Sequence, residues 1–186
     1  MTRPQMFATI VFILLGSFVV FAETKEQKQA DVRKQASATM DRLYKSQPSA
    51  RAAIQNAAGY AVFTSKSVKI LVGGSGRGRG IAVDNATQKV TYMKMGEIQA
   101  GLGMGVKKFS VIFVFEKKAA LLKFINSGWE FGGQTTAAAK SGDGGGAYQG
   151  ATSLSPGVWM YQLTDKGLAL ELTVKGTKYS KDDKLN

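Results

Sequence analysis

The sequence predicts a single α+β domain in which a curved, barrel-like, glycine-rich antiparallel sheet packs with N-terminal and mid-chain helices. Three observations lead to this fold class. Apolar residues recur at helical spacing over residues 23–46. From residue 59 onward, short β-type runs alternate with turn residues. Glycine occupies every second position over 74–80 and again over 101–105, which is typical of strands with one bare face that bend and let another layer approach closely.

The first 22 residues have the pattern of a secretory signal peptide. Arg3 supplies the positive charge, an apolar run covers 7–21, and Val20-Phe21-Ala22 loosely fits a cleavage site before Glu23. The apolar run falls short of the ~20 residues that span a bilayer. We therefore expect cleavage, with an uncleaved anchor as the alternative.

Residues 23–186 are expected to form one domain, helical over 23–58 and mainly β over 59–180. The chain has 186 residues, of which 44% are hydrophobic, and this suits one buried core better than two. It has no cysteine, so a lipid-modified cysteine and disulfides are excluded. The expected location is periplasmic or secreted, with peripheral contact to a membrane left open.

Two helices are expected before the sheet. The apolar stripe of the first, 23–46, consists of Val32, Ala36, Met40 and Leu43. Such a helix either covers a sheet or lies on a membrane, and we favour the first. Pro48 suits the first turn of a second helix, which would run to Asn56 and end near Gly59.

The strands are expected to begin just after these helices. Short β-type runs at 60–63 and 68–72 precede the glycine stretch, which leads into 81–83. Residues 84–88 are turn-like, so 90–95 is expected to pair back as a hairpin.

Residues 109–115 form the most strongly β-type run, and they are apolar on both faces, which predicts a central strand covered on both sides. A helix over 116–125 should follow and stop at Asn126-Ser127-Gly128. Residues 129–131 read as another extended piece.

The last third of the chain is expected to hold one more hairpin, made of 158–164 and 168–175. Residues 141–146 should be the most flexible stretch. The polar tail from Ser180 is expected to fray.

The residue inventory argues against catalysis. With no histidine and no cysteine, the usual general base, thiolate chemistry and nearly all zinc sites are excluded. The acidic residues are scattered, without paired spacing. The glycine stretch is not a phosphate loop either, because Arg79-Gly80 stands where Lys-Ser/Thr is required. We expect no catalytic residue, no metal site and no cofactor.

The positive charge is concentrated in the middle of the chain. From Glu23 onward there are 24 Lys+Arg and 13 Asp+Glu, a net charge of +11, and residues 60–128 hold 11 of the basic and 3 of the acidic residues. Such a field favours anionic partners, although a merely solvated basic surface is the alternative. We expect no nucleic-acid partner, because no RNA-binding signature is present and Arg-Gly-Arg-Gly is too short for an RGG tract.

Five segments, taken in order, resemble the SYLF domain family of lipid-binding proteins, in particular its bacterial exported branch. They are Tyr60-Ala-Val-Phe63, Val72-Gly-Gly-Ser-Gly-Arg-Gly-Arg-Gly80, Gly101-Leu-Gly-Met-Gly105, Val111-Ile-Phe-Val-Phe115 and Gly176-Thr-Lys-Tyr179. The resemblance covers about residues 36–179. It implies a curved antiparallel sheet with packed helices, binding to acidic phospholipids, and no catalytic residues.

The function expected from these observations is non-enzymatic binding to an anionic phospholipid surface. The candidate lipid-binding residues are Arg77, Arg79, Lys66, Lys69, Lys107 and Lys108. Yeast relatives in the family also bind actin, but no SH3-like extension exists here and an exported protein would not meet actin, so we expect no actin partner. The alternative function is an envelope structural or adaptor module that binds protein or glycan; a protein partner cannot be named from the sequence.

Overall fold

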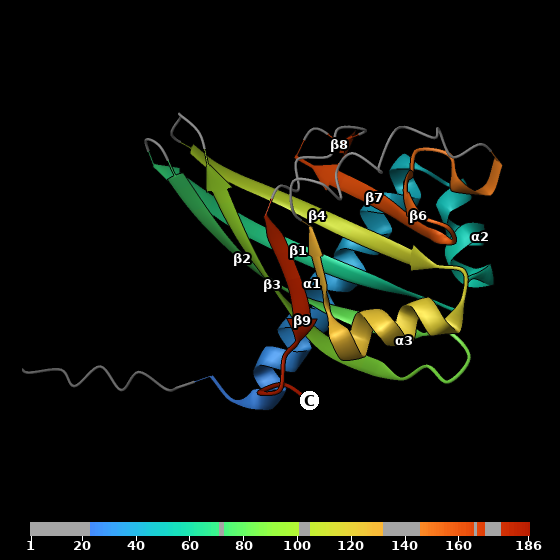
Figure 1. Ribbon diagram of the computed structural model, residues 1–186, viewed down its shortest axis with the longest axis horizontal. Coiled ribbons are helices and arrows are strands. Elements are labelled where there is room, and N and C mark those ends of the chain that lie inside the picture. The colour runs from blue at the N-terminus through green and yellow to red at the C-terminus, as the bar shows by residue number, and fades with distance from the viewer. Residues whose placement is uncertain (1–22, 71–72, 101–104, 132–145, 166, 170–175) are drawn as a thin grey trace, which may run out of the picture.

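A computed structural model describes residues 23–70, 73–100, 105–131, 146–165, 167–169 and 176–186. In these ranges the chain forms three α-helices, a short 3-10 helix (η1, Gly146–Tyr148) and one nine-stranded antiparallel sheet that curls into a half-barrel (Figure 1). The predicted α+β class with a curved antiparallel sheet is confirmed.

The two N-terminal helices form as the sequence predicts. Helix α1 (Lys25–Ser46) begins with a capping box: the Thr24 hydroxyl accepts a hydrogen bond from the Gln27 N–H, and the Gln27 side chain accepts one from the Thr24 N–H. All four residues of its predicted apolar stripe are buried. Helix α2 (Ser49–Asn56) starts right after Pro48. Because the buried stripe of α1 packs on the sheet, this helix covers the sheet.

The strands are β1 (Gly59–Ile70), β2 (Gly73–Asp84), β3 (Val90–Ala100), β4 (Gly105–Phe115), β5 (Trp129–Phe131), β6 (Thr152–Ser155), β7 (Val158–Thr164), β8 (Gly167–Ala169) and β9 (Thr177–Lys181). Their order is β5-β9-β3-β2-β1-β4-β7-β6, and β8 pairs with β7. The two β-type runs expected before the glycine stretch are joined in a single strand, β1, as far as Ile70, and residues 71–72 lie outside the described residues. The hairpins β2–β3 and β7–β8 form as predicted, although residues 170–175 lie outside the described residues.

The sheet has a hydrophobic core on each face. Leu43 of α1 and Ile54 of α2 pack with Val62, Ile112 and Tyr161 on one face. On the other face lies α3 (Lys118–Ser127). Figure 1 shows α1 and α3 on opposite sides of the long strands. Strand β4, buried from Val111 to Phe115, contributes to both cores, as expected of a central strand.

The second core holds most of the fully buried aromatic side chains in the described part of the chain. Phe63 and Tyr179 meet edge to face, with ring centroids 4.7 Å apart. Phe113 of β4 and Phe124 of α3 pack beside them. Helix α3 ends at Gly128, whose φ of 69° is the left-handed conformation that favours glycine at a helix end, as the sequence predicts.

The glycine face of β2 lies against this second core. A Cβ on Gly78 would lie 2.6 Å from both the Thr64 carbonyl oxygen and Met95 Cγ, and a Cβ on Gly80 would overlap the Val62 carbonyl oxygen. The close approach to backbone predicted for these glycines is therefore confirmed. The second glycine run falls mostly on residues 101–104, outside the described residues, as does 141–145.

The prediction that the tail frays from Ser180 is wrong. Leu185 is 3% exposed and belongs to the first core. The Asn186 amide bonds both backbone groups of Tyr92: its Nδ2 donates to the Tyr92 carbonyl oxygen at 2.8 Å, and its Oδ1 accepts from the Tyr92 N–H at 3.0 Å. The polar tail is ordered because it satisfies backbone groups of β3 that β9 leaves unpaired.

Candidate functional site

Basic side chains from four adjacent strands form two rows on the sheet face that α1 covers. In the first row, Lys66 of β1 pairs with Arg77 of β2 on one side and with Lys108 of β4 on the other. In the second row, Arg79 of β2 pairs with Lys94 of β3. Residues directly opposite each other in a sheet share a face. We call the set Lys66, Arg77, Arg79, Lys94 and Lys108 the basic rows.

The glycine alternation of β2 is what places both arginines on this face. Side chains alternate along a strand, and Gly78 and Gly80 face the second core. Arg77 and Arg79 therefore face the opposite side, and both are exposed. The expectation that the two arginines share one strand face is confirmed.

A groove of about 830 Å³ lies between the first half of α1 and the basic rows. Helix α1 contributes one side of it, with Lys28, Asp31, Val32 and Gln35 at helical spacing. Seven cationic side chains line the groove against three acidic ones, an excess of four positive charges. The cations are the basic rows with Lys28 and Lys184, and the acids are Glu23, Asp31 and Asp182.

No ion pair in the described part of the chain holds a side chain of the basic rows. Among the described residues, ion pairs join Lys118 to Asp84 and Lys178 to Glu130, and neither pair involves the basic rows. All five side chains of the rows are exposed. Their charges are therefore available to an anion from solution.

Three hydroxyl groups mark the boundary between the first core and the groove. Thr39 of α1, Thr64 of β1 and Ser110 of β4 lie with their oxygen atoms 3.3–3.4 Å apart. Thr64 pairs with Arg79 and with Ser110, so this cluster continues the second row. The sheet face thus changes from apolar to hydroxyl to cationic along its strands.

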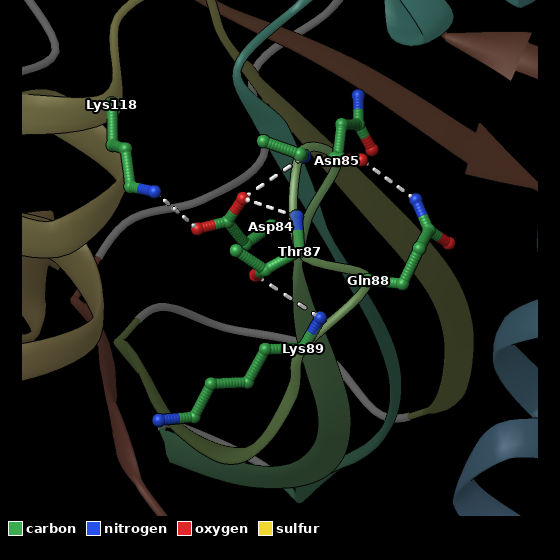
Figure 2. A network of polar contacts seen from close by, with 7 residues as sticks. Asp84, Asn85, Thr87, Gln88, Lys89 and Lys118 are labelled. Atoms are coloured by element: carbon green, nitrogen blue, oxygen red, sulfur yellow. Dashed lines mark hydrogen bonds and ion pairs between the residues drawn. The ribbon is translucent and has the colours of Figure 1, made fainter.

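The β2–β3 register that sets Arg79 opposite Lys94 is fixed at the hairpin turn (Figure 2). Asp84 Oδ1 accepts hydrogen bonds from the N–H groups of Ala86 and Thr87, at 3.0 and 3.2 Å. Its Oδ2 lies 3.1 Å from Lys118 Nζ on α3. The hydrogen bond from Lys118, and then those from the turn, lower the pKa of the Asp84 carboxyl below its ordinary value.

The structure brings together four of the six candidate residues proposed from sequence: Lys66, Arg77, Arg79 and Lys108. The backbones of the other two are placed, with Lys69 opposite Gly105 and Lys107 opposite Ser67. Their side chains lie outside the described residues.

Sequence reasoning missed three cations of the groove: Lys94, Lys28 and Lys184. Lys94 could have been found by counting pairs outward from the predicted turn, since the hairpin register leads directly from Val83 and Val90 to Arg79 and Lys94. No local signal marks Lys28 or Lys184, because their approach to the groove depends on how α1 and the tail pack.

The lysine and arginine side chains of the groove offer an anion positive charge and hydrogen-bond donors. In the described part of the chain, no group of three or more acidic side chains could hold a metal ion. No helix in these ranges has both the length and the hydrophobicity to cross a membrane.

Comparison with known proteins identifies the family. Residues 96–186 match the family described as Las17-binding protein actin regulator. A curated relative, beta cell expansion factor A of Aeromonas veronii, is 32% identical over 159 residues. Residues 96–186, just under half of the chain, belong to this family, the SYLF domain family. The match to the relative covers 84% of this chain and 58% of the relative, so the chain spans less than two thirds of that protein's length.

The SYLF family is known for lipid binding rather than for catalysis. The region that matches the SYLF family model begins at Gly96 in β3 and includes Lys108. The other four residues of the basic rows precede that region.

Proposed function

We propose that this SYLF-domain protein is a non-enzymatic, exported protein that binds anionic phospholipid head groups in the groove between α1 and the basic rows. One observation carries the proposal: five exposed cationic side chains from four adjacent strands share one face. Each Lys or Arg near an anionic membrane surface contributes about 1 kcal/mol. Several acting together give useful affinity, whereas isolated surface lysines do not.

The chemistry of the groove suits phosphate groups. A guanidinium presents a planar fork of donors that matches phosphate oxygens, and a lysine ammonium acts as a compact point charge. Arg77 and Arg79 lie about 7 Å apart along β2, the spacing of alternate residues in a strand. The two arginines can therefore contact separate phosphate groups, with Lys66, Lys94 and Lys108 around them.

Export is proposed from the first 22 residues together with the cap of α1. The capping box uses only Thr24 and Gln27, so removing residues 1–22 would leave the start of the helix intact. We propose cleavage before Glu23 and a periplasmic or secreted product. The intact mass of the exported protein tests this proposal, and retention of residues 1–22 would contradict it.

Co-sedimentation with vesicles tests the binding proposal. Wild-type protein is mixed with phosphatidylcholine vesicles and with vesicles in which half of the lipid is phosphatidylglycerol, each at low and high ionic strength. We expect binding to the anionic vesicles alone, and weaker binding in high salt, since the Debye length falls from ~10 Å at 0.1 M to ~3 Å at 1 M. Absence of binding to anionic vesicles would contradict the proposal and favour an adaptor that binds protein or glycan.

A further inference from the structure

Ile98 is the more exposed of two large hydrophobic side chains that stand out in the described part of the chain. Its exposed fraction is 75%, and that of Leu122 is 42%. The Ile98 N–H donates to the Gly176 carbonyl oxygen at 3.0 Å, so strand geometry holds the residue in place. A single exposed isoleucine is ordinary on a protein surface. Its neighbours decide whether it has a role.

The register places Ile98 at one end of a row that crosses four strands. Ile98 of β3 pairs with Ser75 of β2, Ser75 pairs with Val68 of β1, and Val68 pairs with Val106 of β4. Three of these four positions are aliphatic in the sequence. We call this set of register positions the aliphatic row.

The register positions of the aliphatic row run directly beside those of the basic rows. Val68 stands two residues after Lys66, and Ser75 stands two residues before Arg77. This spacing puts the aliphatic row about 7 Å beyond the nearest cations, toward the strand ends. Figure 1 shows these ends of β1, β2, β3 and β4 extending past all three helices, at the upper left.

The order of the rows matches the layering of a bilayer surface. A membrane presents anionic phosphates first and apolar chains beneath them, and interfacial proteins bury their apolar groups ~5–10 Å into this boundary. The neighbouring cations select an anionic surface over a neutral apolar one. Charge complementarity and spacing therefore both point to a bilayer as the partner of this face.

We propose that the ends of β1–β4 enter the surface of an anionic bilayer, with Ile98 beneath the phosphates and Lys66 and Arg77 beside them. This inference rests on the proposed function and adds to it an orientation and a depth. The long axis of the strands then points toward the membrane, and the groove opens at the level of the head groups.

The absence of cysteine from the chain allows a direct test of depth. Two variants, Ile98→Cys and Gln55→Cys, are labelled with an environment-sensitive fluorophore; Gln55 is exposed on α2, away from the strand ends. The vesicles are equimolar phosphatidylcholine and phosphatidylglycerol. We expect the label at 98 to move to an apolar environment on binding and to be quenched by lipids brominated near the head group. The label at 55 should remain in water.

The outcomes separate this inference from the proposed function. If the labelled protein co-sediments with the vesicles and the label at 98 stays in water, the inference fails and the groove proposal stands. If the protein does not co-sediment, both fail. A change in the label at 98 that depends on protein concentration without vesicles would show a face between two copies of the chain, and would also contradict the inference.

A second pair of variants tests the contribution of Ile98 to affinity. Ile98→Ser should lower the affinity for the same vesicles about tenfold, because the apolar burial is lost. The loss should be similar at low and high salt, since apolar contacts are not screened by ions. Ile98→Leu should bind like the wild type. Equal binding by Ile98→Ser and the wild type would contradict the proposal, and circular dichroism confirms that both variants fold.

Discussion

Lys66 and Arg77 lie directly opposite each other across β1 and β2, with Lys108 directly opposite Lys66 on the other side. Like charges in directly opposite positions destabilise a sheet by about 0.2–1 kcal/mol per pair. Among the described residues, no carboxylate pairs with these three side chains. The repulsion is therefore a cost to folding, and an anionic ligand would relieve it.

Lys66→Gln should separate stability from binding. It removes the central charge of the row, so the free energy of unfolding should stay equal or rise by up to about 1 kcal/mol. Binding to anionic vesicles should weaken. Urea denaturation and co-sedimentation on the same preparation measure both quantities. A variant that loses stability and binding together would indicate that Lys66 supports the fold and would contradict this assignment.

Gly78→Val should destabilise the sheet more than Ser75→Val. The new side chain at 78 would meet the Thr64 carbonyl oxygen and Met95 Cγ, each 2.6 Å from its Cβ, and the carbonyl oxygen belongs to the neighbouring strand and cannot turn away. Such overpacking costs about 1–3 kcal/mol. Ser75 is exposed on the opposite face, so its substitution should change stability by less than about 0.5 kcal/mol. Equal small effects in thermal unfolding would contradict the alternating-face arrangement.

Asp84→Asn should lower stability at neutral pH and lose this effect in acid. The pKa of the Asp84 carboxyl is lowered in the folded state, first by the hydrogen bond from Lys118. A lowered pKa stabilises the fold above the ordinary aspartate pKa of about 4, and this contribution disappears as pH falls through the folded-state value. Urea midpoints of the two proteins should differ at pH 7 and converge below about pH 4. A difference that does not depend on pH would show that the carboxylate charge is unimportant.

Tyr161→Phe should not destabilise the protein at neutral pH. The side chain is buried in the first core, and its hydroxyl has no hydrogen-bond partner among the described residues. Removing an unpaired buried polar group is neutral or stabilising, by up to about 1–3 kcal/mol. A loss of more than about 1 kcal/mol in urea denaturation would reveal a partner for this hydroxyl.

The same variant has a predicted effect in alkali. Burial, and then the nearby Tyr148, raise the pKa of Tyr161 from 10.0 to about 12. Burial makes ionisation of this hydroxyl less favourable in the folded state than in the unfolded state, so the fold loses stability as pH rises from the unfolded-state pKa toward the folded-state value. The wild type should therefore lose stability between pH 10 and about pH 12 more steeply than Tyr161→Phe.

The parts of the fold that the sequence predicts correctly depend on local patterns. The stripe of α1, the turn at 84–88 and the stop at Gly128 each follow from residues close together in the chain, and each is confirmed. The alternating glycines of β2 likewise predict that Arg77 and Arg79 share a face. The ordered tail could not be predicted in this way, because it depends on hydrogen bonds between Asn186 and Tyr92, which are 94 positions apart in the sequence.

The basic rows could be predicted only in part, for the same reason. They depend on the register between β1 and β4, whose residues Lys66 and Lys108 are far apart in the sequence. Neighbouring residues on a strand face opposite sides, and a shift of one position reverses every face. The sequence alone therefore does not determine whether Lys107 or Lys108 joins the row, and both are among the candidates predicted from it.

A charge experiment on the basic rows needs a control pair of cations that lies outside the groove. Two tail lysines, Lys181 and Lys184, are distant from the arginines in sequence, but Lys184 lines the groove. Lys117 caps the start of α3 and Lys123 lies within it. Both are exposed, and α3 is on the opposite side of the sheet from the groove. The pair Lys117→Gln/Lys123→Gln removes the same charge as Arg77→Gln/Arg79→Gln without touching the groove.

Vesicle binding by these two double variants tests the central claim most directly. Each arginine near an anionic surface contributes about 1 kcal/mol, so losing both should weaken binding about tenfold or more. Both variants should remain folded, since exposed charges rarely stabilise by more than about 1 kcal/mol. We predict a large loss of co-sedimentation with anionic vesicles for Arg77→Gln/Arg79→Gln and almost none for Lys117→Gln/Lys123→Gln. Equal losses for the two variants would contradict a localised site and leave only the general positive charge of the protein.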